Sequence, residues 1–299
     1  MTSISHILCP VDFSEFSRRA LDHAIAMARW YDARLTMLHV FVNMGAVDLP
    51  PIELGEEGRE RLLADMRRFA VAPPDPPISL LILEAPDTHR EILHQIDALH
   101  ADLLVIGSHG RTGFERLLLG SVSEKLIRKA ACSVMVVPRG APDAARGGAV
   151  RFSRILCPVD FSEGSLAALA YAFSIAQEAN ARLTIMHAIE VPPELAEDPV
   201  SPSFNIDAIH AAARAARLQR LRELVPESAR TYCTVETTVR EGAAYDQILN
   251  VAAEQESDMI VMGVHGRGAI NLLVFGSNTV RVTRAATCPV LVVRRQRPQ

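Results

Sequence analysis

The chain contains two copies of one sequence, and this duplication limits what it can fold into. The stretch ILCPVDFSE occurs at residues 7–15 and again, without change, at residues 155–163. At the same offset, ARLTMLHVF at 33–41 is matched by ARLTIMHAI at 181–189. Self-similarity over a span of this length indicates two fused copies of one domain rather than one large domain.

The spacing of the matched blocks predicts where the domains begin and end. A later block, DLLVIGSHGR at 102–111, matches DMIVMGVHGR at 258–267, and there the offset is eight residues longer. We expect this insertion in the Pro-rich stretch at 191–203. The chain is long enough for two ordinary domains. Between them lies a stretch rich in Gly, Ala and Pro, so the predicted organisation is a linker at 139–151 between domains at 1–139 and 152–296.

Short apolar stretches alternate with helical patterns along each copy. In the first copy, five apolar stretches are typical of buried strands, and Ser14 is a candidate N-cap for the first helix. This alternation predicts an α/β fold, a parallel sheet with helices on both faces. Ligands of such sheets bind beyond the carboxyl ends of the strands, where the strand order reverses. The expected strands are 6–11, 34–41, 78–83, 102–107 and 133–137, and the expected helices are 14–31, 56–70, 88–100 and 121–130.

Composition argues against several classes of protein. The formal net charge is −4 and no long basic block occurs, so we expect no nucleic-acid partner. No apolar run approaches membrane-spanning length, and no secretory signal is visible at the start. The five cysteines form no C-x-x-C pair, so we expect reduced, buried thiols in a cytoplasmic protein. The scattered histidines form no close ligand cluster, so no metal-ligating residues are predicted.

Glycines recur with one spacing after the fourth predicted strand of each copy. The pattern is Gly-x2-Gly-x9-Gly-Ser, although RTGFERLLL within the first copy has become RGAINLLVF in the second. Glycines let backbone N–H groups approach an anion, and the final Gly-Ser opens a helix whose first N–H groups lack partners. Ser121 and Ser123 can add hydroxyl donors, and Arg111 can lie over a phosphate tail. Turns alone are the alternative, but the duplicated spacing favours a phosphate site built on Gly107, Gly110, Gly120, Gly263, Gly266 and Gly276.

A carboxylate, Asp12 or Asp160, follows the first predicted strand of each copy. It can accept hydrogen bonds from ribose hydroxyls or an adenine amino group, and it can also favour the start of a helix through the dipole. The two roles are compatible. Val40 and Ala188 end the second predicted strands, where their backbone can read an adenine edge; packing in the core is the alternative. If the first and fourth strands are neighbours, carboxylate and glycine loop face one crevice.

These motifs resemble the universal stress protein family. The resemblance rests on PVDFSE after one strand, LHV at the end of another, and the glycine pattern with GSHGRTG and GSVSEKL, and it covers nearly the whole chain once per half. It implies two Rossmann-like domains of the adenine nucleotide alpha hydrolase-like type, each a five-stranded parallel sheet of order 3-2-1-4-5. It also implies ATP held between the aspartate and the glycine loop. Mg²⁺ can accompany the ATP, with water and phosphate as its main ligands.

Two sets of residues match the family's nucleotide contacts. The first set is Pro10, Asp12, Val40, Gly107, Gly110, Arg111, Gly120, Ser121, Val122 and Ser123. The second set is Pro158, Asp160, Ala188, Gly263, Gly266, Arg267, Gly276, Ser277, Asn278 and Thr279. The second copy departs at Ala188, at Asn278 and at Ala269, which stands where the first copy has Gly113, so we expect altered affinity there. The resemblance also implies that the fifth strands of the two domains pair, which makes the chain an intramolecular pseudo-dimer. The sequence does not decide whether the chain also assembles into homo-oligomers.

Three functions remain open at this point. They are an ATP-binding regulator of the stress response with at most slow hydrolysis, an ATP-hydrolysing enzyme, and a structural dimerisation module with empty sites. Phosphoryl transfer requires positioned cations and an oriented nucleophile, and the chain has neither a P-loop lysine nor an acidic pair set aside for a metal. His109 and His265 are loop histidines rather than clear catalytic bases. The regulator is therefore the predicted function, without catalytic residues.

Overall fold

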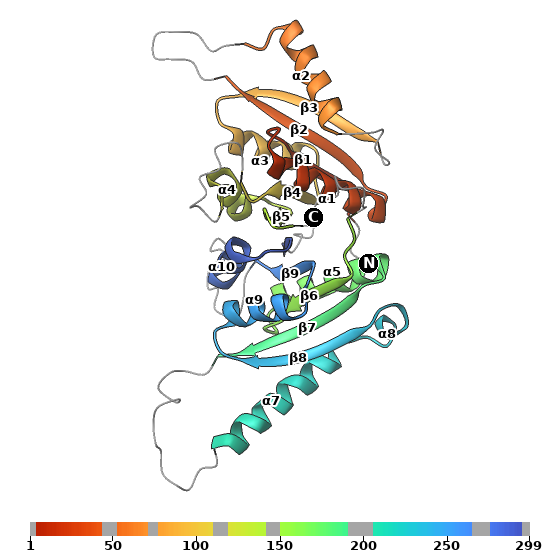
Figure 1. The fold of residues 1–299 in the computed structure, drawn as a ribbon, viewed down its shortest axis with the longest axis vertical. Coiled ribbons are helices and arrows are strands. Elements are labelled where there is room, and N and C mark those ends of the chain that lie inside the picture. The colour runs from red at the N-terminus through yellow and green to blue at the C-terminus, as the bar shows by residue number, and fades with distance from the viewer. Residues whose placement is uncertain are drawn as a thin grey trace. The chain divides into compact units, whose positions relative to one another are not determined.

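The computed structural model describes residues 4–43, 53–70, 77–109, 119–141, 150–190, 206–264 and 276–294. The chain forms two compact units. The first comprises Met1–Arg151 with Ala286–Gln299, and the second comprises Phe152–Ala285. Each unit is built of strands and helices in alternation (Figure 1). The predicted insertion at 191–203 lies outside the described residues.

The first unit is built on a parallel sheet of order β3-β2-β1-β4-β5, as the family resemblance implies. A sixth strand, β10, comes from the end of the second repeat and pairs antiparallel with β5. The two fifth strands therefore pair directly, while the pseudo-dimer itself stays a prediction. The strands are β1 (His6–Pro10), β2 (Arg34–Val42), β3 (Ile78–Ala85), β4 (Leu103–Gly107), β5 (Ser133–Val137) and β10 (Val290–Val293).

Helices cover both faces of this sheet (Figure 1). The first helix packs across β1, β2, β4 and β5, while the third and fourth helices contact each other. The first helix begins at the predicted cap: Ser14 Oγ accepts a hydrogen bond from the Ser17 N–H at 3.2 Å. Such a cap satisfies one of the orphan donors of the first turn. The helices are α1 (Glu15–Tyr31), α2 (Glu56–Phe69), α3 (Thr88–Ala98) and α4 (Ser121–Lys129).

The second unit repeats this arrangement with four parallel strands in the order β8-β7-β6-β9. Its first helix packs on β6, β7 and β9, as α1 packs on the matching strands of the first unit. The strands are β6 (Arg154–Pro158), β7 (Arg182–Ile189), β8 (Val235–Glu241) and β9 (Met259–Gly263). The helices are α5 (Glu163–Ala179), α7 (Ile206–Glu223), α8 (Ala229–Tyr232), α9 (Ala244–Glu254) and α10 (Ser277–Ala285).

The core consists of the central strands and the apolar faces of the helices that pack on them. All residues of β4, β5, β9 and β10 are buried, and this explains their continuous apolar sequences. The five cysteines are free thiols, and all but Cys233 are buried, as predicted. Burial raises the pKa of Cys132 to about 12, so this thiol stays protonated. Among the described residues, no helix combines the length and apolar character needed to span a bilayer.

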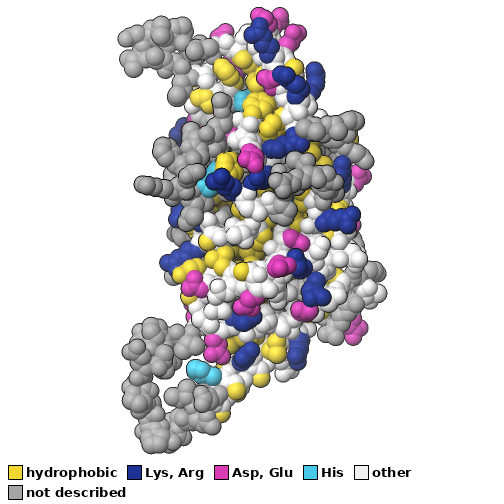
Figure 2. Space-filling model, viewed as in Figure 1, with side chains coloured by type: hydrophobic (Ala, Val, Ile, Leu, Met, Phe, Trp, Pro, Cys, Tyr) yellow, Lys and Arg dark blue, Asp and Glu magenta, His cyan; other side chains and the backbone are white. Residues whose placement is uncertain are grey.

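Charged side chains of both signs are interspersed on the molecular face drawn in Figure 2. Several form pairs one helical turn apart, such as Arg128 with Glu124 at 3.1 Å on α4. Exposed pairs of this kind contribute only a few tenths of a kcal/mol each, on the order of 0.3–0.5. The fold therefore depends on its buried sheets far more than on its surface charges.

An aspartate directly before the fourth strand of the first unit holds the start of the first strand. Asp102 Oδ2 accepts hydrogen bonds from the backbone N–H groups of Ser5 at 2.8 Å and His6 at 3.0 Å. The Ser5 hydroxyl donates to the same oxygen at 2.6 Å. One carboxylate thus joins two strands that lie far apart in the sequence.

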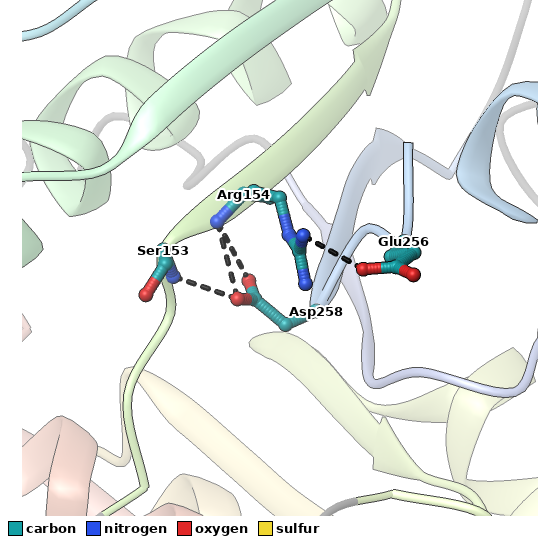
Figure 3. Close-up of polar contacts among 4 residues, drawn as sticks. All are labelled: Ser153, Arg154, Glu256 and Asp258. Carbon is teal, nitrogen blue, oxygen red and sulfur yellow. Dashed lines mark hydrogen bonds and ion pairs between the residues drawn. The ribbon is translucent and has the colours of Figure 1, made fainter. Parts of the chain in front are cut away.

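The second unit has the same clamp in front of β9 (Figure 3). Asp258 accepts from the backbone N–H groups of Ser153 at 2.7 Å and Arg154 at 3.1 Å. The Arg154 guanidinium forms an ion pair with Glu256 at 2.9 Å. Desolvation raises the pKa of Asp258, although the backbone donors oppose that shift. Both copies therefore pin the first strand to the fourth with an aspartate.

His23 makes the stability of the first unit depend on pH. The imidazole is 1% exposed within α1, its Nδ1–H donates to the Arg19 carbonyl at 2.8 Å, and burial lowers its pKa to about 4. Between that value and the ordinary 6.5, the unfolded chain binds a proton that the native chain does not. The free energy of unfolding should therefore fall by about 2 kcal/mol between pH 7.5 and pH 5. Urea unfolding at both pH values measures this loss.

The second repeat offers the control, because Tyr171 stands at the position that matches His23. His23→Tyr and His23→Leu should both reduce the difference in unfolding free energy between the two pH values. An equal loss of stability in the wild type and in both variants would contradict the assignment to His23.

Candidate functional site

The two predicted parts of the site lie at one edge of each sheet. β1 and β4 are parallel neighbours, with Leu8 opposite Leu104, so their carboxyl ends meet at the same edge. The aspartate segment follows β1 and the glycine loop follows β4. The second unit has the same arrangement, with Leu156 of β6 opposite Ile260 of β9. The condition set by the sequence, that first and fourth strands be neighbours, is therefore met.

The aspartate after β1 shapes the turn into α1. Asp12 Oδ1 accepts from the Ser14 N–H at 3.1 Å and from the Ser14 hydroxyl at 2.5 Å. Asp160 holds Ser162 in the same way, at 3.0 Å and 2.6 Å. This is an Asx turn, in which the side chain imitates a backbone turn. The helix-start role considered from the sequence is therefore real, and contact with a nucleotide stays a prediction.

The phenylalanine after each aspartate has a left-handed backbone. Phe13 has φ of 63° and Phe161 has φ of 64°, which is a costly conformation for a bulky residue. Each ring lies 4.8 Å, between centroids, from a histidine near the end of the second strand, His39 or His187. The His39 Nδ1–H donates to the Val11 carbonyl at 2.7 Å. This pair was not predicted from the sequence, although both copies contain Phe and His at these positions.

The backbone of Val40 points to the side of β2 on which β1 lies. Leu38, two residues earlier, accepts from the Val11 N–H at 2.8 Å on that side. Asn43 instead donates to Ala85, toward β3. Backbone groups alternate sides along a strand, so Val40 shares the side of Leu38, beyond the point where β1 ends. Its N–H and C=O therefore face the space next to the aspartate turn.

Ala188 occupies the same place in the second unit. Met186 accepts from the Val159 N–H at 2.7 Å, toward β6, and Ile189 accepts from the Gly242 N–H at 2.9 Å, toward β8. Ala188 therefore directs its backbone groups to the β6 side. Both copies present a strand backbone to the same region of the site.

The helix after the glycine loop begins without a side-chain cap. The Glu124 N–H is bonded to the Gly120 carbonyl at 2.9 Å, so the N–H groups of residues 121–123 come before the helical ladder. The Gly120 N–H donates to the Ser108 carbonyl at 2.7 Å and closes the base of the loop. Four predicted residues of the loops, namely Gly110, Arg111, Gly266 and Arg267, lie outside the described residues.

The second loop is closed in the same manner. The Gly276 N–H donates to the Val264 carbonyl at 3.0 Å, and the ladder of α10 begins with the Val280 N–H on the Gly276 carbonyl at 3.1 Å. Residues 277–279 therefore supply the corresponding N–H groups.

The hydroxyl of Ser123 joins α4 to β4. It is buried and donates to the Gly107 carbonyl at 2.9 Å. Thr279 makes the same bond to the Gly263 carbonyl at 3.0 Å. The Ser123 hydroxyl was predicted as a phosphate donor, but its proton is engaged within the protein. Ser121 is exposed at the start of the helix.

The missing side chain of Gly107 makes room for α1. A Cβ on Gly107 would lie 3.0 Å from the backbone of Phe16, and one on Gly263 would lie 2.7 Å from the backbone of Gly164. A Cβ on Gly120 would meet its nearest neighbour, the Ser108 carbonyl, at an ordinary 3.4 Å. Helix packing therefore accounts for the first glycine of each pattern, whereas the third glycine stands at an open helix end.

Comparison with known proteins identifies the family. The universal stress protein family model matches residues 3–138 and 151–294, once per repeat. The chain belongs to this family. A universal stress protein of Mycolicibacterium smegmatis is 28% identical over 300 residues, which cover 96% of each chain. One from Mycobacterium tuberculosis is 30% identical over 280 residues, which cover 87% of each chain.

Solved structures of the family share the fold. A universal stress protein from Archaeoglobus fulgidus is 22% identical, with a TM-score of 0.66 over 97% of this chain and 98% of that one. A putative universal stress protein from Pseudomonas aeruginosa is 17% identical, with a TM-score of 0.67 over 98% of this chain and 94% of that one. The predicted α/β fold is thus confirmed by these structures.

The first and third glycines of the pattern should respond differently to an added methyl group. Gly107→Ala should lower the free energy of unfolding by about 1–3 kcal/mol, because the new methyl group meets helix backbone that cannot rotate away. Gly263→Ala should cost at least as much, since its approach is closer. Gly120→Ala is the matched control and should change the stability little. Urea unfolding of the three variants tests this, and equal losses would contradict the packing role.

Proposed function

We propose that this universal stress protein binds ATP at the carboxyl edge of each sheet and acts as a nucleotide-dependent regulator of the stress response. One observation carries the proposal. In both copies, an aspartate turn and the start of a helix follow neighbouring parallel strands. A nucleotide needs both, because one end carries hydroxyls and an amino group and the other carries anionic phosphates.

The start of α4 supports phosphate binding. The N–H groups of residues 121–123 come before the first bond of the helical ladder, and the helix dipole places partial positive charge at this end. Gly120 precedes them with no side chain to keep an anion away. Anions bind readily at such helix ends. The start of α10, behind Gly276, offers the same donors in the second copy.

The opposite part of the site suits the nucleoside. A carboxylate only accepts hydrogen bonds, so Asp12 is matched to ribose hydroxyls, which donate them. The N–H and C=O of Val40 form a donor and acceptor pair of the kind that reads an adenine edge. The Val40 side chain is buried, which gives the base an apolar neighbour. In the second unit, Asp160 repeats the carboxylate and Ala188 repeats the backbone donor and acceptor pair, although the Ala188 side chain is only half-buried.

Regulation is favoured over hydrolysis by what surrounds the proposed phosphate position. In the part of the chain that the structure describes, no group of three His, Cys, Asp or Glu residues is placed to hold a metal ion. His109, a candidate base, has its Nδ1 at 3.0 Å from Ser108 Oγ and its ring 5.4 Å from that of Phe16. These contacts are those of a structural histidine. We therefore propose at most slow hydrolysis, with Mg²⁺ held by water and phosphate when it accompanies ATP.

The decisive experiment identifies the nucleotide and counts its turnovers. Freshly purified protein is denatured, and the released small molecules are separated by chromatography. Calorimetry of nucleotide-free protein then gives the number of ATP sites, and phosphate release gives the turnovers. Bound ATP with no more than slow turnover is the expected result. Rapid multiple turnovers would support an enzyme, and no binding under any condition would support a structural module.

Gly120→Leu should abolish ATP binding in the first copy while the fold survives. The backbone of Gly120 has φ of −69° and ψ of 148°, which any residue can adopt, but a leucine side chain would cover the helix start. Calorimetry should show loss of one of two ATP sites. Gly55→Leu is the matched control, because Gly55 also precedes a helix and nothing lies within 4 Å of its added Cβ. Unchanged ATP stoichiometry in Gly120→Leu would refute the phosphate assignment.

Asp12→Asn should weaken ATP binding more than binding of tripolyphosphate. The amide oxygen of asparagine can still accept from the Ser14 N–H, so the turn is kept, while the charged acceptor for the ribose is lost. We expect about a tenfold weaker ATP affinity, since hydrogen bonds to charged groups contribute about 1.5–3 kcal/mol. Calorimetry with both ligands measures the difference. Equal losses of affinity for the two ligands would exclude a role in binding the nucleoside.

A further inference from the structure

Arg294, at the end of the second repeat, is bound to a helix of the first unit. Its backbone N–H donates to Ser133 Oγ at 3.2 Å. Its Nη2 donates to the backbone carbonyls of Ile127 at 3.0 Å and Arg128 at 2.7 Å. Arg294 directly follows β10, which pairs with β5 and belongs to the first compact unit. The carboxyl end of α4 is therefore held by a residue that the second repeat encodes.

The chemistry of this contact is that of a helix cap. The last carbonyls of a helix lack N–H partners within the helix, and a guanidinium can satisfy two of them at once. Its positive charge also complements the negative end of the helix dipole. Arg294 is half-buried, and burial lowers the pKa of its guanidinium, but arginine stays charged at neutral pH. Reduced contact with water limits the screening of this charge.

We propose that Arg294 is a positioning residue for the nucleotide site of the first repeat, an inference that rests on the proposed function. α4 has nine residues and is held at both ends. Ser123 ties its amino end to β4, and Arg294 ties its carboxyl end to the strand pair β5 and β10. The N–H groups of residues 121–123 then keep their direction before a ligand arrives. Donors that are already ordered bind more tightly than donors that must first be ordered.

The second repeat cannot build the same contact. Pro138 stands at the position that matches Arg294, and Pro289 stands at the position that matches Ser133. Proline has neither a side-chain donor nor a hydroxyl that could replace these two partners. The matching residues of the second repeat therefore cannot form the Arg294 contacts. These contacts make the affinity of the first site depend on the end of the second repeat.

The test compares Arg294→Ala and Arg294→Lys in a Gly276→Leu background, in which only the first site can bind ATP. Calorimetry measures the ATP dissociation constant, and hydrogen exchange of α4 amides is measured without nucleotide. Arg294→Ala should weaken ATP binding about tenfold and speed exchange along α4, since two charge-assisted hydrogen bonds are lost. Arg294→Lys, which keeps the charge, should recover part of both. Lys129→Ala removes an exposed cation from the same helix turn, and this control should leave both measurements within about twofold of the parent.

Each outcome decides the proposal. A lower ATP dissociation constant for the parent than for Arg294→Ala, together with faster α4 exchange in the variant, supports it. Unchanged exchange, or faster exchange with unchanged ATP affinity, overturns it. If the wild-type protein binds no ATP, the proposed function fails, the positioning role falls with it, and exchange still shows whether Arg294 caps α4. If Arg294→Ala does not fold, Arg294→Gln, which keeps a neutral donor, is measured in its place.

Discussion

The parallel pairing of β1 with β4 decides where every other part of each site can lie. The chain builds outward from β1 in one direction, returns, and continues from β4 in the other. The segments that leave these two strands therefore diverge from a common edge. Asp102 fastens one end of the strand pair through Ser5 and His6. At the other end of the pair, the last residue of β4 is Gly107, whose missing side chain lets α1 pack closely against it.

The two repeats form the same hydrogen bonds at matching positions, and some of the residues that form them differ. The aspartate turn, the left-handed phenylalanine, the closed loop base and the bond from helix to strand occur in both. Ser123 in one repeat is Thr279 in the other, and each hydroxyl makes the same bond. The contacts of Arg294 have no such counterpart. The two repeats have therefore kept the same hydrogen bonds around the candidate site, whereas the Arg294 contacts with α4 are specific to the first.

The sequence was sufficient to predict features that depend on local pattern. The strands and helices of the first copy were predicted close to their observed ends, and Ser14 caps α1 as expected. Apolar periodicity and capping chemistry act over a few residues, so they can be read from the chain. The strand order followed from the family resemblance.

Features that depend on contacts between distant segments were missed. The sequence did not show that Gly107 faces the backbone of Phe16, that Ser123 donates to Gly107, or that Phe13 adopts a left-handed backbone. The aspartates before the fourth strands were also missed, although ADLLVIG and SDMIVMG place one at the same point in both copies. These roles arise only when the sheet is assembled, because each partner is far away in the chain.

The hydrogen bond from Gly120 to Ser108 has a consequence for how this family diversifies. It ties the two ends of the glycine loop together, so the sheet and the following helix are anchored independently of the residues between them. The loop sequence can therefore change without moving the strand before it or the helix after it. RTGFERLLL in the first repeat and RGAINLLVF in the second illustrate such a change. Substitutions can therefore accumulate in this span of one repeat while the span of the other repeat stays unchanged.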